Sequence, residues 1–123
     1  MGLINSILTW VMKKRIHQIE LFMKYPHEVQ DELLKKLLQT ARHTAFGKKY
    51  GFGDIVTYES YRERVPVHTY EQIFPYIDRL MHGEQNLLWP TEIKWFSKSS
   101  GTTNARSKFI PVSTEALEDC HFK

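Results

Sequence analysis

A glycine-centred loop rich in hydroxyl side chains is the feature that most constrains this chain. The loop runs from Ser99 to Asn104, with Gly101 at its centre. Residues 93–96 before it and residues 108–112 after it have the apolar and aromatic composition of short strands. A turn-forming segment between two such strands predicts a β-hairpin, which we expect to span residues 93–112.

The chemistry of this loop favours a phosphate ligand. Gly101 permits a close backbone approach, and successive loop N–H groups and hydroxyls can surround an anion. No acidic residue occurs between Glu92 and Glu115, whereas four basic residues lie there: Lys94, Lys98, Arg106 and Lys108. The segment therefore predicts a triphosphate site. A polar hairpin turn with no ligand is the alternative, because Ser, Thr, Gly and Asn are also the residues that ordinary turns prefer.

The order of these residues resembles the phosphate-binding signature of the acyl-adenylate-forming superfamily, in which an aromatic strand leads into Ser-Gly-Thr-Thr-Gly and a Lys follows. Residues 96–113 are more closely similar to the auxin-responsive promoter (Gretchen Hagen) family of acyl-acid amido synthetases, in its bacterial branch. The similarity extends over about residues 20–123 and includes the upstream segments 58–67, Tyr70-Glu71, 76–79 and Gly83-Glu84. Two positions depart from the superfamily pattern: Asn104 replaces a glycine, and Lys108 lies one residue further along.

The resemblance implies a ligase that uses ATP and Mg²⁺ to adenylate a carboxylic acid and then transfers the acyl group to an amine or amino acid. It implies the following ATP phosphate-binding residues: Ser99, Ser100, Gly101, Thr102, Thr103, Asn104, Arg106 and Lys108. No catalytic residue and no metal ligand is assigned within this chain. Family members are several times longer, so we expect residues 1–123 to be the incomplete N-terminal portion of an adenylate-forming domain, inactive alone.

Composition excludes several other classes of protein. The formal charge is +3, but residues 1–24 carry four basic residues against one acidic, and the remainder is balanced. The chain is therefore not expected to bind nucleic acid. A single cysteine, Cys120, favours a reducing, cytoplasmic location, and the six histidines show no zinc spacing.

The apolar periodicity predicts a mixed α and β chain that is rich in helix. Helices are expected over residues 4–24, 26–45 (with Gly47 as the stop) and 57–64, and from the capping box at Thr69 to His82. Residues 51–54 are expected to be loop, and residues 26–90 to form a helical region. Ser113 is expected to cap a further helix over residues 113–123. Three aromatic residues are expected to pack in the core: Tyr76, Trp95 and Phe96.

The helix over residues 4–24 is basic and amphipathic, and it leaves two interpretations open. Packing against the rest of the protein is preferred, whereas Trp10 and the Lys13-Lys14-Arg15 cluster also suit an interfacial membrane contact. A secretory signal is not expected, because the positive charges follow the apolar run and no small-residue cleavage site is present. As a second class of function, the chain is a non-catalytic helical interaction module that self-associates or domain-swaps.

Overall fold

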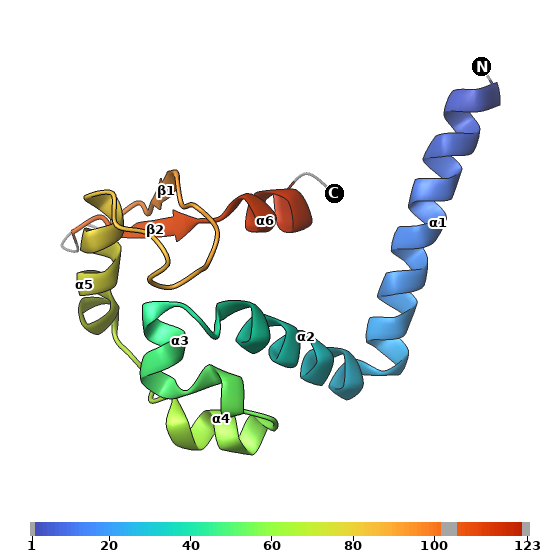
Figure 1. The fold of residues 1–123 in the computed structure, drawn as a ribbon. Coiled ribbons are helices and arrows are strands. Elements are labelled where there is room, and N and C mark those ends of the chain that lie inside the picture. The colour runs from blue at the N-terminus through green and yellow to red at the C-terminus, as the bar shows by residue number, and fades with distance from the viewer. Residues whose placement is uncertain (1, 102–105, 122–123) are drawn as a thin grey trace. The chain divides into compact units, whose positions relative to one another are not determined.

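The computed structural model describes residues 2–101 and 106–121, with side chains for residues 5–101 and 106–119. The chain divides into two compact units, Met1–Lys36 and Leu37–Lys123. The first unit contains α1 (Gly2–Lys24) and most of α2 (Pro26–Ala41), and the second contains everything that follows (Figure 1). Among the residues described, no helix combines the length and the apolar character needed to span a bilayer.

The second helix ends earlier than the sequence predicts. α2 stops at Ala41 rather than at residue 45, because the Thr44 side chain turns inward and is completely buried. Its hydroxyl donates to the Ala41 carbonyl at 2.7 Å and accepts from the Gly47 N–H at 3.0 Å. The same contact caps a new helix, α3 (Ala45–Tyr50), so Gly47 lies inside a helix instead of ending one.

The start of α3 is fixed by a distant loop. The Ala45 N–H donates to the Asn86 carbonyl at 3.0 Å, and the Phe46 N–H donates to the Leu87 carbonyl at 2.9 Å. These bonds satisfy amides that a helix N-terminus otherwise leaves without partners. Asn86 adopts a φ of 58°, a left-handed conformation that Asn tolerates better than most residues. The segment that contains Asn86 and Leu87 is therefore hydrogen-bonded to the start of α3.

Capping residues set the bounds of the following helices, and the sequence predicts one of these caps, at Thr69. Gly51, with a φ of 64°, ends α3, and residues expected to be loop form a 3₁₀ turn, η1 (Phe52–Asp54). Thr57 caps α4 (Tyr58–Arg64). Thr69 and Gln72 form a reciprocal capping box at the start of α5 (Tyr70–Met81), which confirms the predicted start of that helix.

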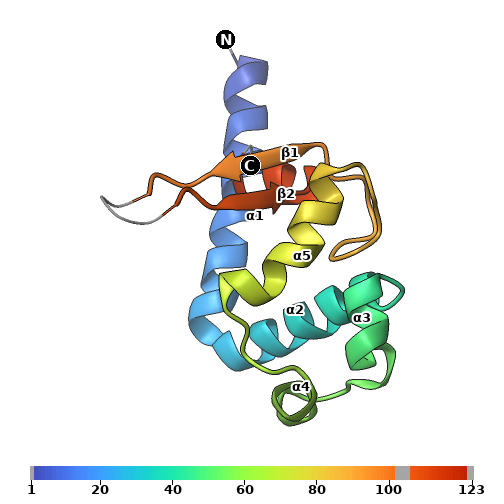
Figure 2. The ribbon, with the colours of Figure 1, turned by 90° about the vertical axis from the view of Figure 1, so that its left-hand side faces the viewer.

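The hairpin consists of β1 (Trp95–Lys98) and β2 (Phe109–Val112), paired antiparallel with Trp95 opposite Val112 and Lys98 opposite Phe109. β1 begins two residues later than residue 93, the predicted start. The reason is that the Gln85 side chain holds the Ile93 backbone, accepting from its N–H at 2.8 Å and donating to its carbonyl at 3.2 Å. α5 lies beside the hairpin (Figure 2).

Ser113 caps the segment after the hairpin, as predicted, by accepting from the Ala116 N–H at 3.1 Å. That segment contains α6 (Thr114–Ala116) and continues as a π-helical turn, η2 (Leu117–His121). The structure thus confirms the expected fold class, a mixed helix-rich chain with a two-stranded antiparallel hairpin.

The core of the second unit lies between α5 and the start of the hairpin. Leu80, Leu87 and Ile93 are buried together, and Tyr76 and Phe96 pack against them as predicted. Trp95 is 62% exposed, so the prediction that it belongs to the core is wrong. The cause is the strand register, because successive residues of β1 face opposite sides and Phe96 takes the inward position.

We predict that Gly47→Ala destabilises the protein by about 3 kcal/mol, since overpacking a closed site costs energy of this order. A Cβ at this position would lie 2.0 Å from the Ala41 carbonyl oxygen, and a backbone atom cannot move aside as a side-chain tip can. Urea unfolding measures the change as a lower midpoint.

Gly53→Ala is the matched control, because nothing lies within 4 Å of the added Cβ. Its stability should stay within about 0.5 kcal/mol of the unmodified protein. Equal unfolding midpoints for the two variants would contradict the close approach of Gly47 and Ala41.

Candidate functional site

The predicted phosphate loop belongs to the segment that connects β1 to β2. Beyond Lys98 and Phe109 the strands remain joined by Ser99 and Lys108: the Ser99 N–H donates to the Lys108 carbonyl at 2.9 Å, and the Lys108 N–H donates to the Ser99 hydroxyl at 3.0 Å. This pair forms the base of the loop. Ser100 and Gly101 follow and are exposed, and Arg106 is exposed on the returning side. The predicted contacts Thr102, Thr103 and Asn104 lie outside the described residues.

The hydrogen bonds at the loop base give the backbone N–H and the hydroxyl of Ser99 different roles. Its backbone N–H is already engaged with Lys108, so that amide is not available to an anion in this arrangement. Its hydroxyl accepts one hydrogen bond and retains its own hydrogen, which can donate to another acceptor. Ser99 can therefore contribute its hydroxyl to a ligand, while its backbone maintains the loop base.

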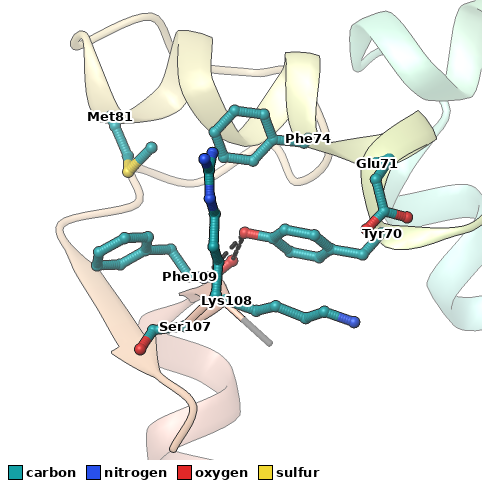
Figure 3. Close-up of a pocket in the computed structure, with 8 residues that line it drawn as sticks. Tyr70, Glu71, Phe74, Met81, Ser107, Lys108 and Phe109 are labelled. Atoms are coloured by element: carbon teal, nitrogen blue, oxygen red, sulfur yellow. Dashed lines mark hydrogen bonds between the residues drawn. The ribbon is translucent and has the colours of Figure 1, made fainter. Parts of the chain in front are cut away.

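Tyr70, the first residue of α5, holds the outer side of β2. Its hydroxyl accepts from the Phe109 N–H at 2.9 Å and donates to the Phe109 carbonyl at 3.1 Å. A strand neighbour would normally use both of these backbone groups, so the tyrosine hydroxyl takes the place of one (Figure 3). Sequence reasoning noted Tyr70 only within the family resemblance and did not assign it this role.

The N-terminus of α5 fixes where that hydroxyl lies. The Thr69 hydroxyl accepts from the Gln72 N–H at 3.4 Å, and the Gln72 side chain accepts from the Thr69 N–H at 2.8 Å. The capping box defines the first turn of the helix and hence the position of Tyr70. This local signal was visible in the sequence, but the partner of Tyr70 lies 39 residues further along the chain.

Charged groups surround the same contact. The Lys108 ammonium lies 5.2 Å from the centre of the Tyr70 ring, and the Lys98 ammonium lies 6.0 Å from that of Phe109. The pKa of Glu71 is lowered, chiefly by a hydrogen bond from its own backbone N–H, then by the Thr69 hydroxyl, and least by the charge of Lys108. An ionised Glu71 and the cation of Lys108 thus share this side of the hairpin.

A pocket of about 580 Å³ opens between α5 and the returning side of the loop. It combines apolar surface from Tyr70, Phe74 and Phe109 with the cationic side chains of Arg106 and Lys108 (Figure 3). The other lining residues are Glu71, Met81 and Ser107. Such a lining suits a ligand that has both an apolar part and a negative charge. The structure therefore brings the two predicted basic residues together in one pocket.

The structure provides no metal centre in the part of the chain that it describes. No group of three or more His, Cys, Asp or Glu side chains in those residues could hold a metal ion.

Comparisons of this chain with a family model and with known proteins agree with one another. The GH3 family N-terminal domain matches residues 15–123. The chain is 33% identical over 107 residues to jasmonoyl–L-amino acid synthetase GH3.5 of Oryza sativa subsp. japonica, covering 86% of this chain and 18% of that protein. It is 30% identical over 106 residues to indole-3-acetic acid-amido synthetase GH3.2 of Arabidopsis thaliana, covering 85% of this chain and 19% of that protein.

A solved structure shares the fold. The chain superposes on the GH3.15 acyl acid amido synthetase with a TM-score of 0.75 at 33% identity, covering 84% of this chain and 19% of that one. The chain thus spans about a fifth of the length of the relatives that it matches.

We predict that Glu71 makes the stability of the protein depend on pH in the acid range. A carboxyl whose pKa is lower in the folded state contributes stability above its unfolded value, near 4.5, and this is lost as the pH falls through the folded value. Urea midpoints of the protein and of Glu71→Gln should therefore differ at neutral pH and converge in acid.

The variant Lys108→Gln separates the contribution of the Lys108 charge to the lowered pKa of Glu71 from the contributions of the hydrogen bonds. Since the Lys108 charge is the least of the three favourable contributions, most of the lowering of the Glu71 pKa should remain in this variant. A carboxyl titration by NMR that returned Glu71 to its ordinary pKa in Lys108→Gln would contradict the dominant role of the hydrogen bond from the Glu71 backbone N–H.

Proposed function

Since the chain belongs to the GH3 family of acyl acid amido synthetases, we propose that it supplies the phosphate-binding hairpin of an ATP-dependent ligase. This ligase adenylates a carboxylic acid and transfers the acyl group to an amine or amino acid. The observation that carries the proposal is the hairpin itself: a hydroxyl-rich loop is closed by Ser99 and Lys108, and its returning side brings Arg106 and Lys108 to one pocket.

The names of the relatives support the class of reaction. Two of these relatives are a jasmonoyl–L-amino acid synthetase and an indole-3-acetic acid-amido synthetase, and another, from Arabidopsis thaliana, is a 4-substituted benzoates-glutamate ligase. Two of the names pair a carboxylic acid with an amino acid, and the third pairs a carboxylic acid with an amido product. We therefore propose these two substrate classes for the whole protein, without choosing a particular acid or amine.

The proposed reaction has two steps. A carboxylate oxygen attacks the α-phosphorus of ATP, the bond to the β-phosphate oxygen breaks, and pyrophosphate leaves. An amine then attacks the acyl carbonyl carbon, loses a proton, and displaces AMP. The first step concentrates negative charge on the departing pyrophosphate, and donors already held in place lower the barrier without covalent catalysis.

In this proposal the hairpin residues have separate tasks. The hydroxyls of Ser99, Ser100, Thr102 and Thr103 donate to phosphate oxygens, and Gly101 and Asn104 allow the backbone to approach them. Arg106 and Lys108 balance the charge that develops on the leaving group. No residue of this chain is proposed to act as a nucleophile, acid or base.

Magnesium commonly bridges phosphate oxygens in reactions of this kind. The described residues do not fit a site for it, because they form no cluster of metal-binding side chains. We therefore assign no residue to magnesium and derive no step through it.

Three further properties belong to the same proposal. Residues 1–123 form the N-terminal portion of a single adenylate-forming domain, and they act in the cytoplasm. Membership of a bacterial branch rests on the sequence resemblance alone, and the relatives compared above are plant proteins.

We predict that the chain binds ATP or inorganic pyrophosphate, and that removing the two cations weakens this binding. Arg106→Gln/Lys108→Gln should raise the dissociation constant roughly tenfold for each charge, since a charge-assisted hydrogen bond contributes about 1.5–3 kcal/mol. Isothermal titration calorimetry with both ligands measures the effect.

Arg62→Gln/Lys94→Gln is the matched control, because it removes two exposed cations that do not line the pocket. Its affinity should equal that of the unmodified chain. If both double variants lost the same affinity, net charge alone would explain the binding, which would contradict the proposed roles of Arg106 and Lys108. If the chain bound neither ligand and assembled as its concentration rose, the interaction module would be favoured instead.

A further inference from the structure

Helix α1 carries features that the proposed function does not use. Residues 1–14 precede the part of the chain that matches the GH3 family domain. Residues 1–24 hold four basic residues and one acidic residue, and the remainder of the chain is balanced. The net charge of +3 therefore resides in this helix.

Apolar side chains on α1 are exposed in unusual number. Every residue from 5 to 24 is exposed, including Ile7 at 59%, Leu8 at 57% and Val11 at 43%. With 3.6 residues per turn, these three side chains share one face of the helix, whereas Thr9 and Lys13 lie on the opposite face. The first half of α1 is thus amphipathic, and its apolar side chains are not buried within the first unit.

An aromatic ring borders the apolar face, and two cations, Lys14 and Arg15, follow on the same side of the helix one turn further along. Trp10 is 66% exposed, and the Lys14 ammonium lies 5.8 Å from the centre of its ring. Lys13 and Arg15 adjoin Lys14. A tryptophan at the edge of an apolar face, next to a group of Lys and Arg, matches the layered polarity of a lipid headgroup region.

We propose that α1 binds peripherally to the surface of an anionic lipid membrane. The helix lies in the plane of the surface, with Ile7, Leu8 and Val11 directed into the acyl boundary. Trp10 lies at the headgroup level, Lys14 and Arg15 contact the lipid phosphates from the same side of the helix one turn further along, and Lys13 adds its positive charge from the opposite side.

Two other arrangements fit the charges less well. A helix that crossed the bilayer would carry Lys13, Lys14 and Arg15 into the hydrocarbon, which is costly, and no described helix is apolar enough to cross. A second copy of α1 would bring a second basic cluster to the interface, and Glu20 is the one carboxylate between residues 1 and 24 that could pair with it. Anionic lipid supplies the opposite charge directly.

Vesicle co-sedimentation of the full 123-residue chain tests the proposal. The probe is phosphatidylcholine vesicles with and without phosphatidylserine, at low and high ionic strength. We expect binding to the anionic vesicles that decreases with salt, because surface charges are screened. Lys13→Gln/Lys14→Gln/Arg15→Gln should weaken it about 100-fold, since each Lys or Arg near such a surface contributes about 1 kcal/mol.

Lys48→Gln/Lys49→Gln/Arg62→Gln is the matched control, since it removes three exposed cations outside α1 and should leave binding unchanged. Tryptophan emission should shift to the blue on binding, and the shift should be lost in Trp10→Phe. Absence of sedimentation would overturn the proposal, as would equal loss in the two triple variants. A dimer that forms without lipid and disappears in Val11→Gln would show that the apolar face of α1 binds a second copy of the chain. This result would also overturn the membrane proposal.

Discussion

The hydroxyl of Tyr70 is the contact on which the arrangement of the candidate site depends. It bonds both backbone groups of Phe109 and so joins the start of α5 to the start of β2. Each such bond contributes about 1 kcal/mol to the stability of the fold. The two bonds together also fix the position of β2 relative to α5. A two-stranded hairpin is marginal by itself, and a helix that holds its outer strand gives it a fixed base.

The contacts on either side of Tyr70 explain why this base is defined. The capping box of Thr69 and Gln72 sets the first turn of α5, and the buried side chains Ile77 and Leu80 anchor the same helix in the core. On the other side, Ser99 and Lys108 continue the strand pairing by one residue pair beyond β1 and β2. The core therefore positions α5, α5 positions β2, and the strand pairing positions Ser99 and Lys108 at the base of the loop.

Local chemistry could be predicted from the sequence, and tertiary contacts could not. The caps at Thr69 and Ser113 were predicted because a cap depends on residues three positions apart, whereas the sequence pattern predicts Thr57 as the first residue of a helix and not as its cap. The end of α2 at Ala41 was missed because it depends on burial of Thr44, and the start of β1 because Gln85 holds the backbone of Ile93. At the site, residue order indicated the loop and its cations, but no local pattern reveals that Tyr70 bonds a residue 39 positions away.

Amide hydrogen exchange of the chain with and without ATP tests most directly the claim that this anchored hairpin binds a nucleotide. ATP should slow exchange across residues 98–101 and 106–108. Tyr70→Phe should speed exchange of the Phe109 amide and reduce the protection by ATP, while Tyr58→Phe should change neither, because Tyr58 is 55% exposed on α4. Exchange in these segments that is identical with and without saturating ATP would contradict the account.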